Sequence, residues 1–388
     1  MTGEPMNRDY FENLFVLEMA NNHWGDVERA LRIVNEFAQV VRFNDVRAAI
    51  KLQVRDVDQF VHRDWRQRSD IRYIKKTLDT KLSREDLERL IDAIRRNGCI
   101  PGATPFDEAS VRLCNDLGMD FIKIASSDIN DWFLMEEIAK TRKPVSFSTG
   151  GSGLKSIDDV VTFFGRRGIP LAINHCVSIY PSEDHELELD QIDFFGDRYP
   201  DHVVGLSSHE HRSWDTSMHI AYAKGARTFE RHIDIDAGGI SVSPYCSHPE
   251  QIDTWFKAFH KAKEMCGGSK RERRTLPEKE VRYLDSLVRG VYARRDLEPG
   301  HVLSPDDVYL AIPLQHGQLS PREFMTGRLV TQAVRQDEPV RIEQIDSPYG
   351  EIPGLRALIN DRGVEPNAPS TPSTSEAQNG QADDPTGG

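Results

Sequence analysis

The sequence predicts an α/β protein made of a (β/α)8 barrel followed by a small β-rich domain. Strand-like and helix-like segments alternate from residue 14 to about residue 266, and polar side chains cluster where the strands end. Eight such units in about 250 residues match the size of a (β/α)8 barrel. An open doubly wound sheet is the alternative, but no GxGxxG string follows the first expected strand to support it.

Each expected strand is a short run of apolar and β-branched residues. The runs span residues 14–20, 48–54, 99–106, 121–126, 144–150, 170–176, 202–208 and 228–234. Between them lie segments such as SREDLERLIDAIRRNG, in which apolar residues recur three and four positions apart, as in amphipathic helices. Acidic or hydroxyl residues precede several of these segments and glycine closes two of them, as expected at helix ends.

Changes in composition divide the chain into four parts. We expect a barrel domain over residues 1–266, a linker over 267–284, a β-rich domain over 285–347 and a disordered tail over 348–388. The linker is polar, charged and interrupted by Gly and Pro. The tail holds few large apolar residues, so we expect it to bury too little surface to offset the entropy lost on ordering.

Bulk properties narrow the class of protein. The net charge is −13, whereas nucleic-acid binders usually carry a basic balance or stripe. No segment approaches the ~20 apolar residues of a membrane span, and the N-terminus lacks the basic and apolar regions of a secretory signal. The five cysteines are scattered without CxxC spacing, as in reduced proteins. We therefore expect a cytoplasmic protein that binds neither nucleic acid nor membrane.

Lysines and histidines at the expected strand ends point to a functional site. Lys51 and Lys123 lie in apolar runs, and a lysine inside a barrel is unfavourable without an anion or a partner. His209 and His232 each close a strand-like run, and two imidazoles with oxygen ligands suit Mn²⁺ or Zn²⁺. The bland alternative is that such histidines are structural. The pattern favours a metal site beside a cationic, hydroxyl-rich anion site, and hence chemistry on a phosphorylated substrate.

Short strings along the chain carry a resemblance to a known family. They are LEMANNHWGD, IKLQ, TPFDE, FIKIASSD, STGG, HCVSIYPS, GLSSHE, ERHID and ARRDLEPGHVLSPDDV. Each is a weak signal alone, but their order and spacing are specific. Over roughly residues 14–347 the chain resembles the sialic acid synthase family, in which a barrel precedes an antifreeze-like (SAF) domain. Family members condense phosphoenolpyruvate with a hexosamine-type sugar to form nonulosonic acids.

The resemblance implies roles for individual residues. Those that match the phosphoenolpyruvate site are Lys51, Thr104, Lys123, Ser126, Ser148, Ser178 and Ser207. Those that match positions near the sugar are Asn22, Gln53, Asp128 and Tyr180. His209 and His232 match the ligands of a divalent metal, Mn²⁺ first, with Mg²⁺, Co²⁺ or Zn²⁺ as alternatives. Glu18 would act in catalysis with Lys51 and Lys123, relaying a proton or orienting a sugar hydroxyl; it could instead be a buried ion-pair partner of a lysine.

The reaction implied by the resemblance joins C3 of phosphoenolpyruvate to the aldehyde carbon of an open-chain aldose. Water then adds at C2, and loss of phosphate leaves a 2-keto-3-deoxy acid, with a Lewis-acidic metal at the aldehyde. Family members also form a domain-swapped homodimer, in which each small domain caps the barrel of the other subunit.

Departures from the family pattern concern the acceptor. The arginine that the SAF domain usually contributes aligns with Ile312, and Ser208 stands where the family has an aspartate. Serines replace an acidic residue in GGISVSPYCSHPE, after the eighth strand. Exchanging a guanidinium for an apolar side chain removes a fork of donors. We therefore expect an acceptor other than plain N-acetylmannosamine.

Two rival functions remain open from the sequence. A Schiff-base aldolase or lyase would use Lys51 or Lys123 as a nucleophile and would need no metal. A non-catalytic sugar-binding protein would keep the barrel only as a scaffold. The first leaves the paired histidines unexplained, and the second leaves the lysines and hydroxyls unexplained.

Overall fold

The expected barrel is present in the computed structural model, which describes residues 8–68, 70–268 and 272–365. Eight parallel strands pair in sequence order and close through β1 and β8. The strands are β1 (Leu14–Ala20), β2 (Ala48–Val54), β3 (Ile100–Pro105), β4 (Phe121–Ile124), β5 (Val145–Ser148), β6 (Leu171–Cys176), β7 (Val203–Ser208) and β8 (Thr228–His232). Each lies inside the range expected from sequence, so the (β/α)8 prediction is confirmed.

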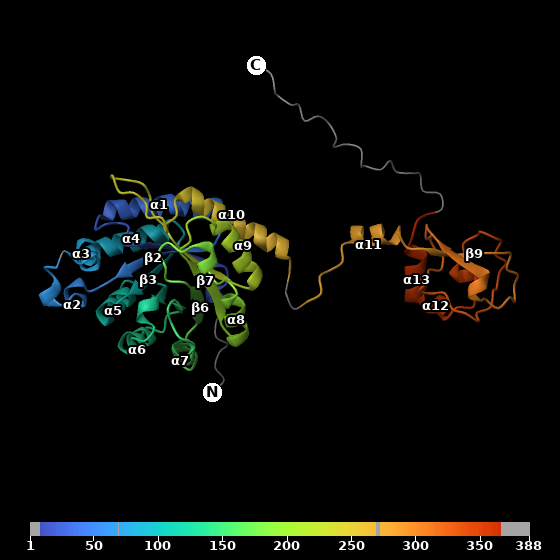
Figure 1. The fold of residues 1–388 in the computed structure, drawn as a ribbon, viewed down its shortest axis with the longest axis horizontal. Coiled ribbons are helices and arrows are strands. Elements are labelled where there is room, and N and C mark those ends of the chain that lie inside the picture. The colour runs from blue at the N-terminus through green and yellow to red at the C-terminus, as the bar shows by residue number, and fades with distance from the viewer. Residues whose placement is uncertain (1–7, 69, 269–271, 366–388) are drawn as a thin grey trace, which may run out of the picture. The chain divides into compact units, whose positions relative to one another are not determined.

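Helices follow the strands and surround the barrel (Figure 1). They are α1 (Val27–Phe43), α4 (Arg84–Arg96), α5 (Glu108–Asp116), α6 (Trp132–Lys140), α7 (Leu154–Gly165), α8 (Gln191–Arg198), α9 (Trp214–Lys224) and α10 (Pro249–Cys266). The connection between β2 and α4 adds α2 (Val57–Phe60) and α3 (Arg72–Asp79). Single-turn helices η1 (Arg8–Phe11), η2 (Arg63–Trp65), η3 (Ser126–Asp128) and η4 (Asp184–Glu186) complete this part.

Local chemistry explains where the helices begin. The Asp26 carboxylate accepts hydrogen bonds from two backbone N–H groups in the first turn of α1, which satisfies donors that have no partner within the helix. At α4, Ser83 and Asp86 form a reciprocal capping box. These are the acidic and hydroxyl positions that the sequence marks as helix starts.

The bottom of the barrel, where the strands begin, is closed by apolar side chains. Phe11, from the short helix before β1, meets Phe121 edge to face with ring centroids 5.9 Å apart. Gly102 on β3 makes room for this packing, because a Cβ there would lie 2.2 Å from the Phe121 ring. With this end filled, the polar chemistry is confined to the other end.

Residues 1–267 and 268–388 form two separate units. In the second, β9 (Gly290–Ala293) pairs antiparallel with β10 (Val308–Ala311) over an apolar core. Its helices are α11 (Glu278–Asp285), α12 (Pro348–Glu351) and α13 (Pro353–Asp361), with single turns η5 (Pro305–Asp307) and η6 (Ile342–Gln344). The segment expected as a linker, 267–284, thus contains most of α11.

The prediction of a disordered tail from residue 348 needs correction. The structure has α12 and α13 in this segment, and Ile359 is buried in the core of the second unit. Arg362 pairs with Glu323 at 2.8 Å, and both side chains are buried. One apolar residue in the right turn and one buried ion pair anchor this segment, which average composition did not reveal. The rest of the expected tail, 366–388, lies outside the described residues.

None of the helices described is both long enough and apolar enough to cross a membrane.

Candidate active site

A cavity of about 570 Å³ opens at the C-terminal ends of the barrel strands. Most of the side chains singled out from the sequence line it. These are Glu18, Lys51, Gln53, Thr104, Lys123, Ser126, Ser148, Ser178, Tyr180, Ser207, His209 and His232. Strand register contributes to this gathering, because Glu18 on β1 lies level with Lys51 on β2 and with His232 on β8.

Two lysines and two glutamates form a buried cluster at the inner end of the cavity. Lys51 pairs with Glu18, and its Nζ lies 3.5 Å from Glu230 Oε1. Lys123 Nζ donates to Glu230 Oε2 at 2.9 Å. Lys51 Nζ also donates to Thr104 Oγ1 at 2.7 Å. Each buried ammonium therefore has a carboxylate partner, as the low dielectric of a barrel interior requires.

The two glutamates differ in their affinity for protons. Burial raises the pKa of Glu18, and Lys51 offsets this only in part. Burial acts on Glu230 too, but Lys123 and Lys51 outweigh it and lower its pKa to about 2. Burial would lower the pKa of Lys51, yet Glu18 and Glu230 raise it, so Lys51 stays a cation. Glu18 is thus the carboxyl group of this cluster best suited to exchange a proton.

Hydroxyl groups surround the space above the lysines. Ser126, Ser148, Ser178 and Ser207 come from four different strand ends and all line the cavity. Gly150 lets two of them converge, because a Cβ there would lie 2.1 Å from Ser178 Oγ and 2.9 Å from Ser126 Oγ. Ammonium groups with convergent hydroxyl donors suit an anion with several oxygens, such as a phosphate or a carboxylate.

His209 and His232 lie side by side, with ring centroids 5.4 Å apart. His209 Nδ1 lies 2.9 Å from Val177 O, so a proton on Nδ1 would leave Nε2 as the free acceptor. Burial lowers the pKa of His209 to about 4, and that of His232 well below its usual value. The Tyr180 ring packs against His209 in a tilted arrangement, with 4.0 Å between ring centroids.

These histidines fit a divalent cation as two neutral nitrogen ligands. The Nδ1 atom of His232 is buried and has no hydrogen-bond partner among the described residues. Within the same residues, no group of three or more His, Cys, Asp or Glu side chains gathers as a complete metal-binding set. A cation held here would therefore need further ligands from water or substrate.

Two residues expected near the sugar adjoin cavity residues in the chain but do not line the cavity themselves. Asn22 and Asp128 are not among the cavity-lining residues in the described part of the chain. Burial raises the pKa of Asp128 to about 6. The Asn22 side chain donates to Ile233 O at 2.8 Å and contacts Cys246 Sγ at 3.4 Å. Its amide is thus engaged in holding the loop after β8.

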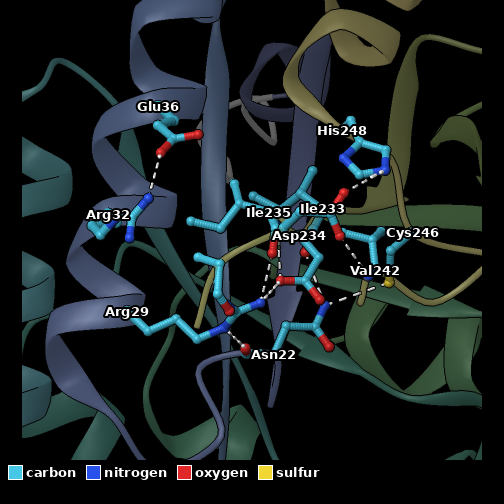
Figure 2. A network of polar contacts seen from close by, with 12 residues as sticks. Asn22, Arg29, Arg32, Glu36, Ile233, Asp234, Ile235, Val242, Cys246 and His248 are labelled. Carbon is cyan, nitrogen blue, oxygen red and sulfur yellow. Dashed lines mark hydrogen bonds and ion pairs between the residues drawn. The ribbon is translucent and has the colours of Figure 1, made fainter. Parts of the chain in front are cut away.

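The same loop is held by Arg29 of α1 (Figure 2). Its guanidinium donates to the Asp234 carboxylate at 2.7 Å and to the backbone oxygens of Asn22 and Ile235. A buried charge with this many partners is well satisfied. This network holds the segment that follows β1 against the segment that follows β8.

Two of the family departures meet at one side chain, Arg231. Its Nε donates to Ser247 Oγ at 2.5 Å, and its Nη1 lies 3.5 Å from Ser208 Oγ. Its Nη1 also pairs with Glu210 Oε2 at 3.0 Å, and both side chains are fully buried. A buried carboxylate thus lies two residues after Ser208, as the ion-pair partner of Arg231.

Several cavity residues escaped the sequence analysis. Glu230 is one; it lies two positions before His232 on β8, so the period-two alternation of strands could have identified it. Arg55, Tyr73, Lys76 and Thr77 also line the cavity. The last three form one face of α3, and no motif marked that helix as part of a site.

The fold and this arrangement of side chains define a class of protein: a (β/α)8 barrel with a cationic, histidine-bearing cavity, joined to a small β-containing domain. Residues 43–271 match the model of the NeuB family, and residues 288–346 match the SAF domain. The chain belongs to the NeuB family and carries a C-terminal SAF domain.

Relatives cover most of the chain. A crystal structure from Chromobacterium violaceum, assigned to spore coat polysaccharide biosynthesis protein E, is 35% identical, with a TM-score of 0.82 over 86% of this chain and 100% of that one. The spore coat polysaccharide biosynthesis protein SpsE of Bacillus subtilis is 25% identical over 82% of this chain and 88% of its own length. The N,N'-diacetyllegionaminic acid synthase of Campylobacter jejuni is 24% identical over 85% and 99%.

Proposed function

We propose that this protein is a transferase that condenses phosphoenolpyruvate with an aldose to form a nonulosonic acid and inorganic phosphate. The observation that carries the proposal is the joint placement of Lys51, Lys123 and two neutral histidines in one cavity. Membership of the NeuB family and similarity to a legionaminic acid synthase support it.

Phosphoenolpyruvate would occupy the inner end of the cavity. Lys51 and Lys123 would attract its phosphate and carboxylate, and the hydroxyls of Ser126 and Ser178 would donate hydrogen bonds across the space that Gly150 leaves free. Binding a multiply charged anion beside Glu18 would raise the pKa of that carboxyl further, since like charges disfavour ionisation. Substrate binding would thereby keep a proton on Glu18.

The acceptor would lie above, with its carbonyl directed to the histidines. His209 and His232 would hold a divalent cation, and a bound cation would supply Lewis-acid polarisation of the acceptor carbonyl. The Glu18 carboxyl, close to Lys51, would deliver a proton to the oxygen that becomes an alkoxide as C3 of phosphoenolpyruvate bonds to the aldehyde carbon. Water would then add at C2, and the C2–O bond to phosphate would break.

A Schiff-base mechanism is less well supported. A nucleophilic lysine needs a neutral amine, which sites obtain by lowering the lysine pKa. Here Glu18 and Glu230 raise the pKa of Lys51, and Lys123 donates to Glu230. Borohydride in the presence of a 2-keto acid would trap a covalent adduct if this alternative were correct.

The test is release of inorganic phosphate from phosphoenolpyruvate with Mn²⁺ across a panel of aldoses, each repeated with EDTA. The proposal expects release that needs both sugar and metal. His209→Ala should lower the rate by at least about a hundredfold, because it removes a metal ligand. His260→Ala is the matched control: that side chain contacts Asn44 O far along α10 and should retain normal turnover. Undiminished activity of His209→Ala would refute the assignment.

A further inference from the structure

The outer part of the cavity holds two cations that neither the sequence motifs nor the proposed reaction uses. Arg55 follows β2, and Lys76 lies on α3; both line the same cavity as the lysines below. Within the described residues, neither Arg55 nor Lys76 forms an ion pair with a carboxylate. The nearest acidic groups, Asp128 for Arg55 and Asp234 for Lys76, act only through space, so both cations keep donors for a second anionic group.

Arg55 is held in a fixed orientation. Its guanidinium lies over the Phe106 ring at 3.6 Å from the centroid, and it donates to Gln53 Oε1 at 3.2 Å and to Tyr73 Oη at 3.1 Å. A guanidinium has five N–H donors, and these contacts engage three of them. The Nε atom is buried and has no partner among the described residues. A rigid fork with unused donors is suited to bind a planar or tetrahedral anion.

Lys76 supplies the second charge. It lies 5.3 Å from the centre of the Trp24 ring, and it is half-buried on the face of α3 that also presents Tyr73 and Thr77 to the cavity. Burial lowers the pKa of Lys76, and the cations Arg72 and Arg55 lower it further, so these positive charges are close enough to repel one another. An anion between them would relieve that repulsion.

The inner and outer cations cannot serve one small ligand equally. The lysines at the inner end already have Glu18 and Glu230, and the serines beside them complete a site for one compact anion. Gln53 links the two regions, since it lines the cavity and its carbonyl oxygen accepts hydrogen bonds from Arg55. The outer cations therefore face the part of the cavity where the acceptor would lie.

We propose that Arg55 and Lys76 form an anion subsite for the acceptor, so that the aldose carries a negatively charged substituent such as a phosphate or a carboxylate. The identity of the ligand as the acceptor rests on the proposed condensation. The binding of an anion by Arg55 and Lys76 does not depend on it. The acceptor would then differ from plain N-acetylmannosamine by a negatively charged group.

The test compares three probes on the full-length protein by calorimetry: N-acetylmannosamine, its 6-phosphate and the corresponding uronic acid. The charged probes should bind at least about tenfold more tightly than the neutral one, and added salt should weaken only their binding. Arg55→Gln and Lys76→Met should each remove about tenfold of that affinity. Lys75→Met is the matched control, since Lys75 lies next along α3, is exposed and pairs with Asp79. Comparing the affinities for the 6-phosphate and the uronic acid would show whether the subsite prefers a phosphate or a carboxylate.

Equal binding of neutral and charged probes would overturn the inference, as would an equal loss for all probes in Arg55→Gln and Lys76→Met. A rise in the KM for phosphoenolpyruvate with every acceptor would do the same, because it would assign these cations to the donor. Phosphate release assays with the same probes separate the two proposals. Tight, Arg55-dependent binding without phosphate release would leave the subsite standing and remove the synthase function. Release with a neutral aldose, unaffected by the variants, would do the reverse.

Discussion

The inner and outer ends of the cavity treat positive charge in opposite ways. At the inner end, Lys51 and Lys123 are almost fully buried, and each contacts a carboxylate. At the outer end, Arg55 and Lys76 are only half-buried and contact aromatic rings instead. The difference follows from solvation, because a buried charge without a partner is strongly destabilising whereas a half-buried one retains water. The inner cations are balanced by carboxylates of the barrel before any ligand binds, whereas the outer cations have no carboxylate in contact among the described residues.

The largest expected effect on stability comes from removing a carboxylate that pairs with a buried lysine at the inner end of the cavity. Glu230→Gln would leave Lys123 without its carboxylate partner and should destabilise the protein by about 3–5 kcal/mol in urea unfolding. The control is Glu88→Gln, which removes an exposed carboxylate that pairs with Arg84 on the surface of α4 and should change stability by less than about 1 kcal/mol. Equal effects of the two substitutions would contradict the contrast between the cavity ends and the surface.

The contribution of the Glu230 carboxylate to stability should depend on pH in the acidic range. The pKa of Glu230 falls from its ordinary 4.5 to about 2 on folding, so its contribution to stability is full above about pH 4.5 and is lost as the pH falls towards 2. A shift of this size corresponds to about 3 kcal/mol. Glu18 acts in the opposite sense, because its pKa is raised. The decisive quantity is therefore the difference between the parent protein and Glu230→Gln, which should shrink steadily over this range.

Sequence reasoning found the inner end far better than the outer one. Lys51 and Lys123 stand out because a lysine inside an apolar strand is conspicuous, and strand period and parallel register then fix where it points. Glu230 obeys the same rule and could have been found. Arg55, Tyr73 and Lys76 could not, because they come from the long connection between β2 and α4. Where such a connection folds depends on tertiary contacts, such as the packing of Arg55 on Phe106.

Asn22, which the resemblance places near the sugar, is not among the residues that line the cavity in the described part of the chain. A polar residue after a strand end is typical of a binding site, but its amide is satisfied by Ile233 O and by Cys246. Only the loop after β8, brought back by the Arg29 network, provides those partners. A chain segment more than two hundred residues away thus decides whether this side chain can face a ligand.

The smallest expected effect measures the outer charge without any ligand. Burial lowers the pKa of His23 to about 4, and the cations Lys76 and Arg29 contribute to that depression. Lys76→Met removes one of these cations, so the pKa of His23 should rise by roughly half a unit, while burial still holds it below 6.5. NMR titration of the imidazole would measure the shift, with Lys75→Met as the variant that should leave it unchanged. If the His23 pKa stayed constant in Lys76→Met, the charge of Lys76 would be effectively screened by solvent, and the outer end would be no more cationic than an ordinary surface.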